Sequence, residues 1–373
     1  MKVVLERNVL LKTLGHVQSV VERRNTIPIL ANVLIRADKD GVSFVATDMD
    51  LEMTEKVAAQ VSKPGAKTAP AHTLYDIVRK LPEGAQVELS ATDTGNQMSL
   101  SSGRSNFKLG CLPVDDFPTM SEGDMQHSFT LSSADFKTLI DRTRFAMSVE
   151  ETRYYLNGIY IHTTKTKGDL AVLRAVATDG HRLARLEMPA PREAGAMSGV
   201  IIPRKAVAEI RKLLDETTAD ITIALSASKA RISFDNVVMT SKLIDGTFPD
   251  YERVIPTGND KILEVHAKTL ANAVDRVATI SSEKSRAIKI ALSKNLLTLS
   301  ASSPEAGSAI EELEVSYKGE AIEIGFNARY LLDILSQVEG DGARFSMADA
   351  ASPTIVQDVS DASALYVLMP MRV

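Results

Sequence analysis

The most informative feature of this chain is a sequence that recurs along it. Residues 46–51 recur at residues 177–183, and residues 70–77 are echoed by residues 203–210. Because the offsets are nearly constant, these are repeats of a whole domain. A weaker third copy occupies the place of the second helix at residues 327–334. Three related domains in 373 residues favour a pseudo-symmetric arc or ring, which is an unusual way to build one catalytic cleft.

Each repeat contains two segments with the spacing of amphipathic helices. In the first, at about residues 7–21, Leu10, Leu14 and Val17 share one apolar stripe. Ser132 is a good N-cap for the corresponding helix of the second repeat. We therefore expect six amphipathic helices, two per repeat, with mostly basic polar faces. The residues expected off the apolar stripes are Lys12, His16, Arg23, Arg79, Lys80, Lys137, Arg142, Arg144, Arg204, Arg211, Lys212, Lys268, Arg276 and Arg329.

Most of the remaining sequence is typical of strands. Apolar and polar residues alternate with period two, and turns rich in Asp, Gly, Asn or Lys separate many of these segments. Clear examples are residues 42–46, 86–90, 220–224 and 296–300. This pattern predicts an α+β fold, with antiparallel sheets on the outside and helices covering the other face.

Length and composition agree with three folded domains. The chain is 44% apolar, which is ample for packed cores. It has no apolar run of about 18 residues, as a membrane span needs, and its first residues are not a signal peptide. Its one cysteine, Cys111, excludes an internal disulfide framework and fits a reducing cytoplasm. Links rich in Gly, Pro and charge divide the expected domains, which are 1–125, 126–256 and 257–373.

The sequence lacks the residue constellations of common enzymes. It has no phosphate-binding glycine motif, and its six histidines lack metal-ligand spacing, so we expect no cofactor and no metal. His181 near Asp179 is the one candidate acid–base pair, but the matching residues 48–50 of the first repeat contain no histidine. A structural or binding role for His181 is therefore favoured over catalysis, and we expect that the chain is not an enzyme.

Two further segments are candidates for binding. Met369 and Met371 flank a proline near the end of the sequence, which is either a frayed last strand or an adaptable peptide-binding surface. Tyr154 and Tyr155 follow Arg153, which is either the start of a buried strand or a contact to a nucleic-acid backbone. The net charge of −5 gives no bulk basicity, so a DNA contact would require charge sorted by face.

Ordered blocks along the whole chain resemble the family of bacterial DNA polymerase III beta subunits, the replicative sliding clamps. The matching blocks are residues 26–30, 153–158, 177–183, 203–205, 240–246, 248–251, 325–327 and 369–372. The resemblance implies a ring-shaped, head-to-tail homodimer in which two helices per clamp domain line a pore around double-stranded DNA. Such a ring is a processivity factor that slides without sequence specificity, because phosphate contacts carry no sequence information.

The resemblance also implies one hydrophobic pocket between the second and third domains that takes a short linear peptide. Its partners would be the catalytic subunit of the replicative DNA polymerase, the clamp-loader complex, and other proteins with a clamp-binding motif, such as repair polymerases, ligase and mismatch-repair proteins, with no membrane partner. A family aromatic near this pocket corresponds to Ser285, so contacts there would differ. The wall of the pocket would comprise Leu156, Thr178, Gly180, His181, Arg182, Leu183, Pro249, Arg253, Val254, Asn327, Tyr330, Val367, Met369, Pro370, Met371 and Arg372.

Two further sets of residues follow from the resemblance. The DNA-contact positions are Arg24, Arg153, Tyr154, Tyr155, Arg204 and Lys205. The dimer seam, between the first domain of one chain and the third domain of the next, would contain Arg104, Phe107, Leu109, Thr279, Ile280, Glu311, Glu312 and Glu314. Asn106, Thr279 and His72 depart from residues common in the family, which implies a seam with fewer charges and less apolar area and a weaker DNA contact at His72.

Two competing functions stay open at this point. One is a non-processive DNA- or protein-binding scaffold with the same fold. The other is a hydrolase built on His181 and Asp179, which the absence of a repeated catalytic set disfavours.

Overall fold

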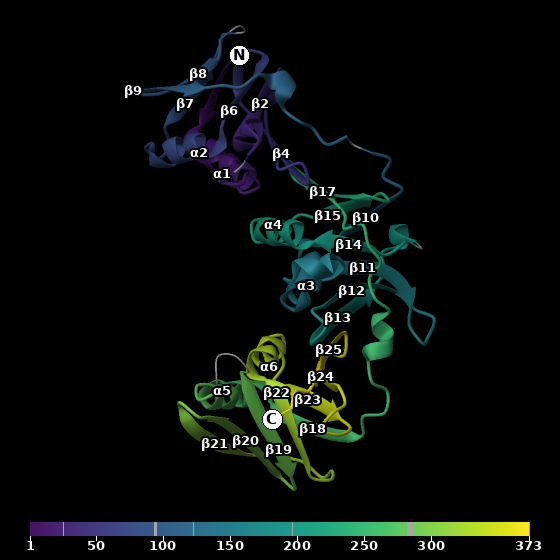
Figure 1. Cartoon of the computed structure of the whole chain (residues 1–373). Helices are drawn as coiled ribbons and strands as arrows, with labels where there is room; N and C mark the ends of the chain where they lie inside the picture. Colours follow the sequence, from purple (N-terminus) through teal and green to yellow (C-terminus); the bar gives the residue numbers. More distant parts are fainter. Residues whose placement is uncertain (25, 93–94, 122, 196, 282–285, 373) are drawn as a thin grey trace. The chain divides into compact units, whose positions relative to one another are not determined.

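The computed structural model describes residues 1–24, 26–92, 95–121, 123–195, 197–281 and 286–372 (Figure 1). Within these residues, each repeat has the order strand, helix, a run of strands, helix and three more strands. Only the first repeat adds a strand to this order within the described ranges, which is β5. The predicted antiparallel α+β fold with two helices per repeat is confirmed.

The bounds of the elements follow the repeats. The first repeat contains β1 (Lys2–Glu6), α1 (Arg7–Gln18), η1 (Pro28–Ala31), β2 (Asn32–Asp38), β3 (Gly41–Thr47), β4 (Leu51–Val57), β5 (Gln60–Lys63), β6 (Gly65–Pro70), α2 (Ala71–Lys80), β7 (Gln86–Ser90), β8 (Gln97–Ser102), β9 (Ser105–Gly110) and η2 (Val114–Asp116). The second contains β10 (His127–Leu131), α3 (Ser133–Asp141), η3 (Arg144–Ala146), η4 (Glu151–Leu156), β11 (Gly158–Lys165), β12 (Ala171–Thr178), β13 (Arg182–Pro189), η5 (Arg192–Ala194), β14 (Val200–Pro203), α4 (Arg204–Leu214), β15 (Ile221–Leu225), β16 (Lys229–Phe234), β17 (Val237–Lys242) and η6 (Tyr251–Val254). The third contains β18 (Lys261–His266), α5 (Ala267–Ala278), β19 (Ala287–Ser293), β20 (Leu296–Ser303), β21 (Gly307–Glu314), β22 (Ile322–Asn327), α6 (Ala328–Leu335), β23 (Gly342–Met347), β24 (Thr354–Asp358) and β25 (Ala364–Leu368).

Two of the four sheets cross the boundaries between repeats. The eight-stranded sheet β10-β15-β16-β17-β4-β3-β2-β6 joins the first repeat to the second, and β14-β11-β12-β13-β25-β24-β23-β18 joins the second to the third. The sheets β5-β1-β7-β8-β9 and β21-β20-β19-β22 each belong to a single repeat. The chain therefore packs as two compact units, residues 1–137, 191–195 and 205–243 in one and the remainder in the other, and the middle repeat contributes to both.

In both eight-stranded sheets, the same kind of strand pair joins one repeat to the next. At the first joint β4 pairs with β17, from Leu51 opposite Ser241 to Glu55 opposite Val237. At the second joint β13 pairs with β25, with Arg182 opposite Leu368 at one end. In the order of each repeat, β21 corresponds to β4 and β13, and β9 corresponds to β17 and β25. Both β9 and β21 have a neighbouring strand on one side only among the described strands.

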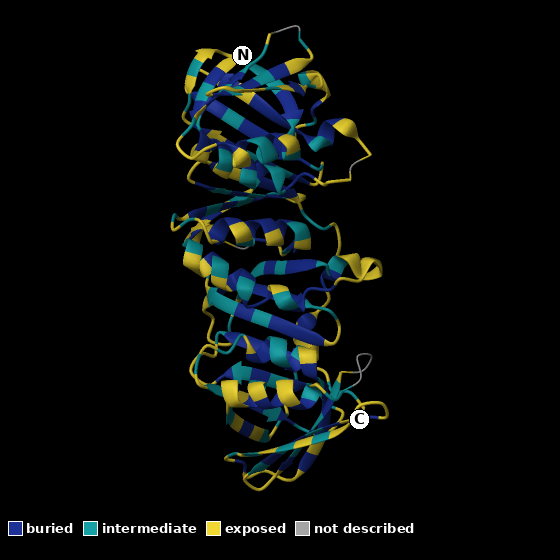
Figure 2. Cartoon of the chain, turned by 90° about the vertical axis from the view of Figure 1, so that its left-hand side faces the viewer, coloured by how far each residue is buried: buried dark blue, intermediate teal, exposed yellow. Residues whose placement is uncertain are grey.

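The helices cover one face of the sheets in each unit. α1 packs against α2, β3 and β4, and α5 packs against α6, β20 and β21. Leu10, Leu14 and Val17 are buried, as their spacing predicts. The helices turn exposed residues outward, whereas the strands behind them are largely buried (Figure 2). No helix in the described ranges has the length and apolar composition to cross a membrane.

Two of the buried arginines are Arg142 and Arg7. The sequence pattern places Arg142 on an exposed helix face and makes no prediction for Arg7. Arg142 was predicted on a polar face, but that prediction is wrong: it follows the end of α3, is 7% exposed and pairs with Glu339 at 2.8 Å. Arg7 is also buried, and its guanidinium donates to the carbonyls of Val78 and Arg79 at 3.1 and 2.6 Å. It thereby adds a second donor to the carbonyl of Val78, which also accepts from the N–H of Leu81, and satisfies that of Arg79 at the end of α2. Ser132 caps α3 as predicted, accepting from the backbone N–H of Asp135 at 3.0 Å.

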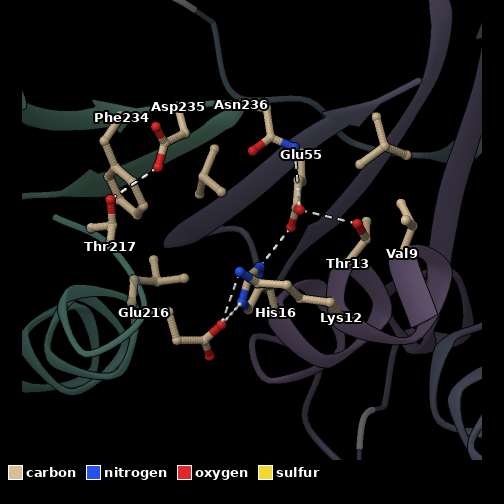
Figure 3. A pocket seen from close by; sticks show the side chains of 13 residues that line it. Val9, Lys12, Thr13, His16, Glu55, Glu216, Thr217, Phe234, Asp235 and Asn236 are labelled. Atoms are coloured by element: carbon tan, nitrogen blue, oxygen red, sulfur yellow. Dashed lines mark hydrogen bonds and ion pairs between the residues drawn. The ribbon is translucent and has the colours of Figure 1, made fainter. Parts of the chain in front are cut away.

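A histidine lies between two carboxylates at the first joint, beside a cavity of about 190 Å³ (Figure 3). His16 Nδ1 lies 2.7 Å from Oε2 of Glu55 on β4, and Nε2 lies 3.0 Å from Oε2 of Glu216 after α4. Both ring nitrogens can donate only when the imidazole is protonated. Burial alone would lower the pKa of His16, but the hydrogen bonds and charges of Glu55 and Glu216 raise it above its ordinary value.

We predict that His16→Ala destabilises the protein more at pH 6 than at pH 9. A histidine whose pKa is raised on folding stabilises the folded state fully below its unfolded pKa of about 6.5, and this contribution is lost as the pH rises through the higher folded value. Thermal unfolding of both proteins at the two pH values measures the difference. His181→Ala, which removes an exposed ring, is the control. A His16→Ala effect that does not change with pH would contradict the assignment.

Candidate functional site

The predicted peptide-binding residues combine a buried apolar floor with a few exposed apolar side chains. Leu156, Leu183 and Val367 are at most 5% exposed and belong to one core cluster of the second unit. Val254 is 49% exposed and Met369 is 39% exposed. Tyr251, three residues before Val254, belongs to this core cluster, and the next residue, Ile255, packs against it. Val254 and Met369 therefore have the exposure that contact with an apolar anchor requires, whereas Leu156, Leu183 and Val367 are core residues.

The end of the chain is held in place by backbone hydrogen bonds. The N–H of Met369 donates to the carbonyl of His181 at 2.9 Å, and the N–H of Met371 donates to the carbonyl of Gly325 at 2.9 Å. Met371 and Arg372 line a broad hollow of about 820 Å³ over the strands β19 to β22. A frayed end is therefore the wrong interpretation for the described part of the tail. The backbone of the tail is thus bonded both to the turn at His181 and to the sheet of the third repeat.

The turn between β12 and β13 is built by its own side chains. Thr178 Oγ1 donates to the carbonyl of Arg182 at 2.7 Å and accepts from the N–H of Gly180 at 3.1 Å. Asp179 Oδ1 accepts from the N–H groups of His181 and Arg182 at 2.9 and 3.1 Å. Gly180 has a φ of 88°, a conformation that side chains disfavour. Asp179 is thus a turn-forming residue, which leaves no basis for a His181–Asp179 hydrolase.

Arg182 is buried, and each part of its guanidinium has a partner. Nε donates to Asp179 at 3.0 Å, Nη1 to Asp333 on α6 at 2.5 Å and Nη2 to the carbonyl of Phe145 at 2.7 Å. The guanidinium also lies over the ring of Tyr330, 4.4 Å from its centre. Arg182 therefore joins the turn of the second repeat to α6 of the third. Its partners Asp333 and Phe145 were not predicted, because no sequence pattern links such distant positions.

The residues around α6 hold an aromatic surface beside this turn. Asn327 caps α6 by accepting from the N–H groups of Arg329 and Tyr330. The exposed ring of His181 stacks on Tyr330, with 6.1 Å between the ring centres. Arg253 lies on the exposed surface and pairs with Asp250 at 2.7 Å. His181 and Arg182 thus both contact Tyr330, whose helix Asn327 caps.

The proposed DNA-contact residues differ in how accessible they are. Arg24 is exposed in the loop after α1, and Tyr154 is 54% exposed. Tyr155 packs against the core cluster and meets Tyr154 edge-on. Arg153 pairs with Glu150 at 3.2 Å. Arg153, Tyr154 and Tyr155 lie on η4, and β11 begins only at Gly158, so the alternative of a buried strand starting at Arg153 is wrong.

Lys205 is already engaged within the chain. Its ammonium pairs with Glu22 at 3.0 Å and with Asp48. Burial would lower the pKa of Lys205, but the hydrogen bonds to Asp48 and Glu22 raise it. The exposed Arg204 keeps one hydrogen bond, to the carbonyl of Met147 at 3.0 Å. A lysine that neutralises two carboxylates has little charge left for a phosphate, so Arg204 is the better DNA-contact candidate.

His72 is turned toward the first helix. Its Nδ1 lies 2.7 Å from Oε1 of Gln18, and its Nε2 lies 3.0 Å from the carbonyl oxygen of Val21. Both ring nitrogens are therefore occupied by contacts within the first repeat. This geometry gives the histidine at the start of α2 a role within the first repeat.

Three sequence families cover nearly the whole chain. The N-terminal, central and C-terminal domains of the DNA polymerase III beta subunit match residues 1–121, 130–250 and 252–372. The chain belongs to the DNA polymerase III beta subunit family. It is 54% identical to the beta sliding clamp of Caulobacter vibrioides and 40% identical to that of Escherichia coli, in both cases over the full length of both chains.

Solved structures agree with this family assignment. A sliding clamp from Bartonella birtlesii bound to griselimycin has a TM-score of 0.97 and 50% identity, with both chains fully covered. A DNA polymerase sliding clamp from Caulobacter crescentus has a TM-score of 0.96 and 53% identity, also with full coverage of both chains.

The predicted seam residues lie on β9 or just before it, on β21 and just after α5. Phe107 is half-buried and Leu109 is buried, whereas Arg104 before β9 is exposed. Glu311 on β21 already pairs with Arg276 of α5, with contacts of 3.1 and 2.5 Å. The remaining predicted seam residues are exposed or half-buried, and they are Thr279, Ile280, Glu312 and Glu314. Ser285 lies outside the described residues.

We predict that Arg182→Ala lowers the free energy of unfolding by about 3–5 kcal/mol, since it leaves two carboxylates without their buried cation. Chemical unfolding measures this loss. Arg253→Ala is the matched control, because it removes an exposed arginine from a single ion pair and is expected to cost less than about 1 kcal/mol. If the two variants lose the same small amount, Arg182 does not hold the two repeats together.

Proposed function

We propose that this beta subunit works as a DNA sliding clamp: a head-to-tail homodimeric ring that encircles double-stranded DNA. The family to which the chain belongs and its full-length similarity to beta sliding clamps support this function. Such a clamp is a processivity factor and not an enzyme. It remains on DNA because the ring is closed around the duplex, so no tight contact is needed.

The observation that carries the homodimer is the pair of strands β9 and β21. The joints between repeats use β4 with β17 and β13 with β25, and β9 and β21 are the remaining members of these two sets. An open strand edge offers unpaired N–H and C=O groups to another strand. A second copy of the chain supplies the missing partner for each strand. Two chains then form six domains with six equivalent joints.

Non-specific DNA contact is supported by the charges on the helices. Lys12, Lys80, Lys268 and Arg329 are exposed, as are the loop residue Arg24 and the first residue of α4, Arg204. The net charge of the chain is nevertheless −5, so attraction to DNA comes from the surface around these basic side chains and not from the charge of the whole chain. Contacts of lysine and arginine with phosphate are sequence-independent and weaken with salt. They guide a ring that slides.

We assign the peptide-binding role to the surface around Val254, Met369, His181 and Tyr330. Exposed apolar side chains over a rigid floor, with a few polar groups at the edge, are the usual form of such a site. Its ligands are apolar segments of the replicative polymerase, the clamp loader and other DNA-processing proteins. We further propose domain boundaries near residues 125 and 256 and a cytoplasmic location, for which the single cysteine is the support.

We predict that the clamp, once loaded, stays on nicked circular DNA and leaves linear DNA quickly. A closed ring has no end to slide from on a circle. Gel filtration of labelled protein with each DNA, at a salt concentration that screens phosphate contacts, measures retention. Equal loss from both DNAs would identify a simple DNA-binding scaffold.

We also predict that deleting residues 369–373 abolishes binding of polymerase-derived and clamp-loader-derived peptides together. The deletion removes Met369 and two backbone hydrogen bonds, each worth about 1 kcal/mol, so folding and dimerisation persist. Peptide titration by calorimetry measures affinity. Met369→Ala with Met371→Ala keeps the backbone hydrogen bonds and tests the side chains alone. Unchanged peptide affinity of the truncated protein would rule out the tail as part of the site.

A further inference from the structure

Both joints within the chain contain an ion pair at the same place. His16 and Arg142 are each the tenth residue after the cap of the first helix in their repeats, counted from Glu6 and Ser132. His16 meets Glu216 at 3.0 Å, and Arg142 meets Glu339 at 2.8 Å. Both glutamates lie in the loop between the second helix of the following repeat and its next strand. The pair therefore accompanies the strand pairing at each joint.

The third repeat carries the same cation, and the described residues contain no repeat after it. His266 caps α5, and the tenth residue after it is Arg276. Arg276 is 60% exposed in its side chain and pairs with Glu311 of its own repeat. This contact repeats that of His16 with Glu55, because Glu311 on β21 matches Glu55 on β4 when the preceding hairpins are aligned. What Arg276 lacks, among the described residues, is the second carboxylate that His16 has in Glu216.

The first repeat carries the matching carboxylate. Glu216 is the second residue after Leu214, where α4 ends, and Glu83 is the second residue after Leu81, which caps the end of α2. Glu83 is exposed and makes no ion pair with any residue that the structure describes. The chain thus holds one cation and one carboxylate of the joint at positions that only two copies can bring together.

We propose that Arg276 forms an ion pair with Glu83 of a second copy of this chain, while keeping its contact with its own Glu311. This inference rests on the proposed head-to-tail dimer and names a contact outside the predicted seam residues. It places a carboxylate–cation–carboxylate arrangement at the seam, as His16 does at the first joint. Because arginine stays protonated at any physiological pH, the seam version does not titrate as His16 does.

Aligning the strands of the seam with those of the first joint gives a second, independent prediction of which residues meet there. The hairpins β8–β9 and β16–β17 match at Ser105 and Val237, so Ser105 falls opposite Glu311 of the second copy. Arg104 then takes the place of Asn236, whose amide donates to Glu55 Oε1 at 3.3 Å and to the carbonyl of Lys56 at 2.8 Å. Arg104 therefore approaches Glu311 and Glu312. One alignment brings both arginines to the same carboxylate of β21.

A double-mutant cycle on the dimer tests the ion pair. The dissociation constant is measured by sedimentation across a dilution series for the native chain, Glu83→Gln, Arg276→Gln and the double variant. Each single change is expected to raise the dissociation constant about threefold to tenfold, and the double change no more than either alone. Glu323→Gln is the control, since Glu323 lies on β22, at the edge of that sheet opposite β21, and pairs with Lys289 of β19. Folding of each variant is checked by its thermal midpoint.

The outcomes distinguish an error in the proposed ion pair from an error in the proposed dimer. Dissociation constants that are unchanged, or that multiply in the double variant, would overturn the Arg276–Glu83 contact and leave the dimer standing. A native chain that stays monomeric at every concentration would overturn the dimer itself.

Crosslinking between two different chains locates the contact directly. In a Cys111→Ala background, one chain carries Glu83→Cys and the other Arg276→Cys, and a short bismaleimide joins thiols that lie close together. A covalent dimer is expected in the mixture and in neither chain alone. Replacing the first chain by one with Glu323→Cys should abolish the crosslink. Crosslinking of Glu83→Cys chains with each other would overturn the proposal, because it would require a head-to-head dimer.

Discussion

The backbone pairing of β4 with β17 and of β13 with β25 is the interaction on which the rest of the structure depends. It turns separate repeats into continuous eight-stranded sheets and leaves β9 and β21 as the two strands of this kind without a second neighbour in the described chain. Strand edges with free N–H and C=O groups must be paired, covered or blocked to avoid uncontrolled association. At the two joints within the chain the requirement is met by self-similarity: β17 pairs with the edge of β4, and β25 pairs with the edge of β13.

Much of the fold could be predicted from the sequence, because repeats and periodicity report local structure. The apolar stripe around Leu10 and Leu14 and the cap at Ser132 are features of single helices, and both are confirmed. The prediction for Arg142 is wrong because the burial of this residue depends on a distant part of the chain and not on local structure. Its helical position suggests exposure, but a carboxylate from another repeat, Glu339, compensates its burial. Pattern alone cannot reveal a charge that is buried only because a distant partner neutralises it.

The candidate peptide site shows the same limit. The resemblance predicts which residues form the site, but it does not rank them by role. Arg182 is a buried connector between the turn and α6, whereas Val254 and Met369 hold the exposed apolar surface. Lys205, counted among the DNA contacts, is held by Glu22 and Asp48. These distinctions come from burial and from paired charges, which depend on the three-dimensional arrangement.

The same joint is made within one chain twice and, in the proposed ring, between chains once per protomer. Two repeats tethered by a short linker face each other at an effective concentration in the millimolar range, so an internal joint that opens closes again at once. The seam has no tether, and its closure depends on how much of the second chain is present. A protein that opens the ring would therefore meet the least resistance at β9 and β21, although the contacts there resemble those of the other joints. Covalent continuity, rather than a weaker interface, would then set where the ring opens.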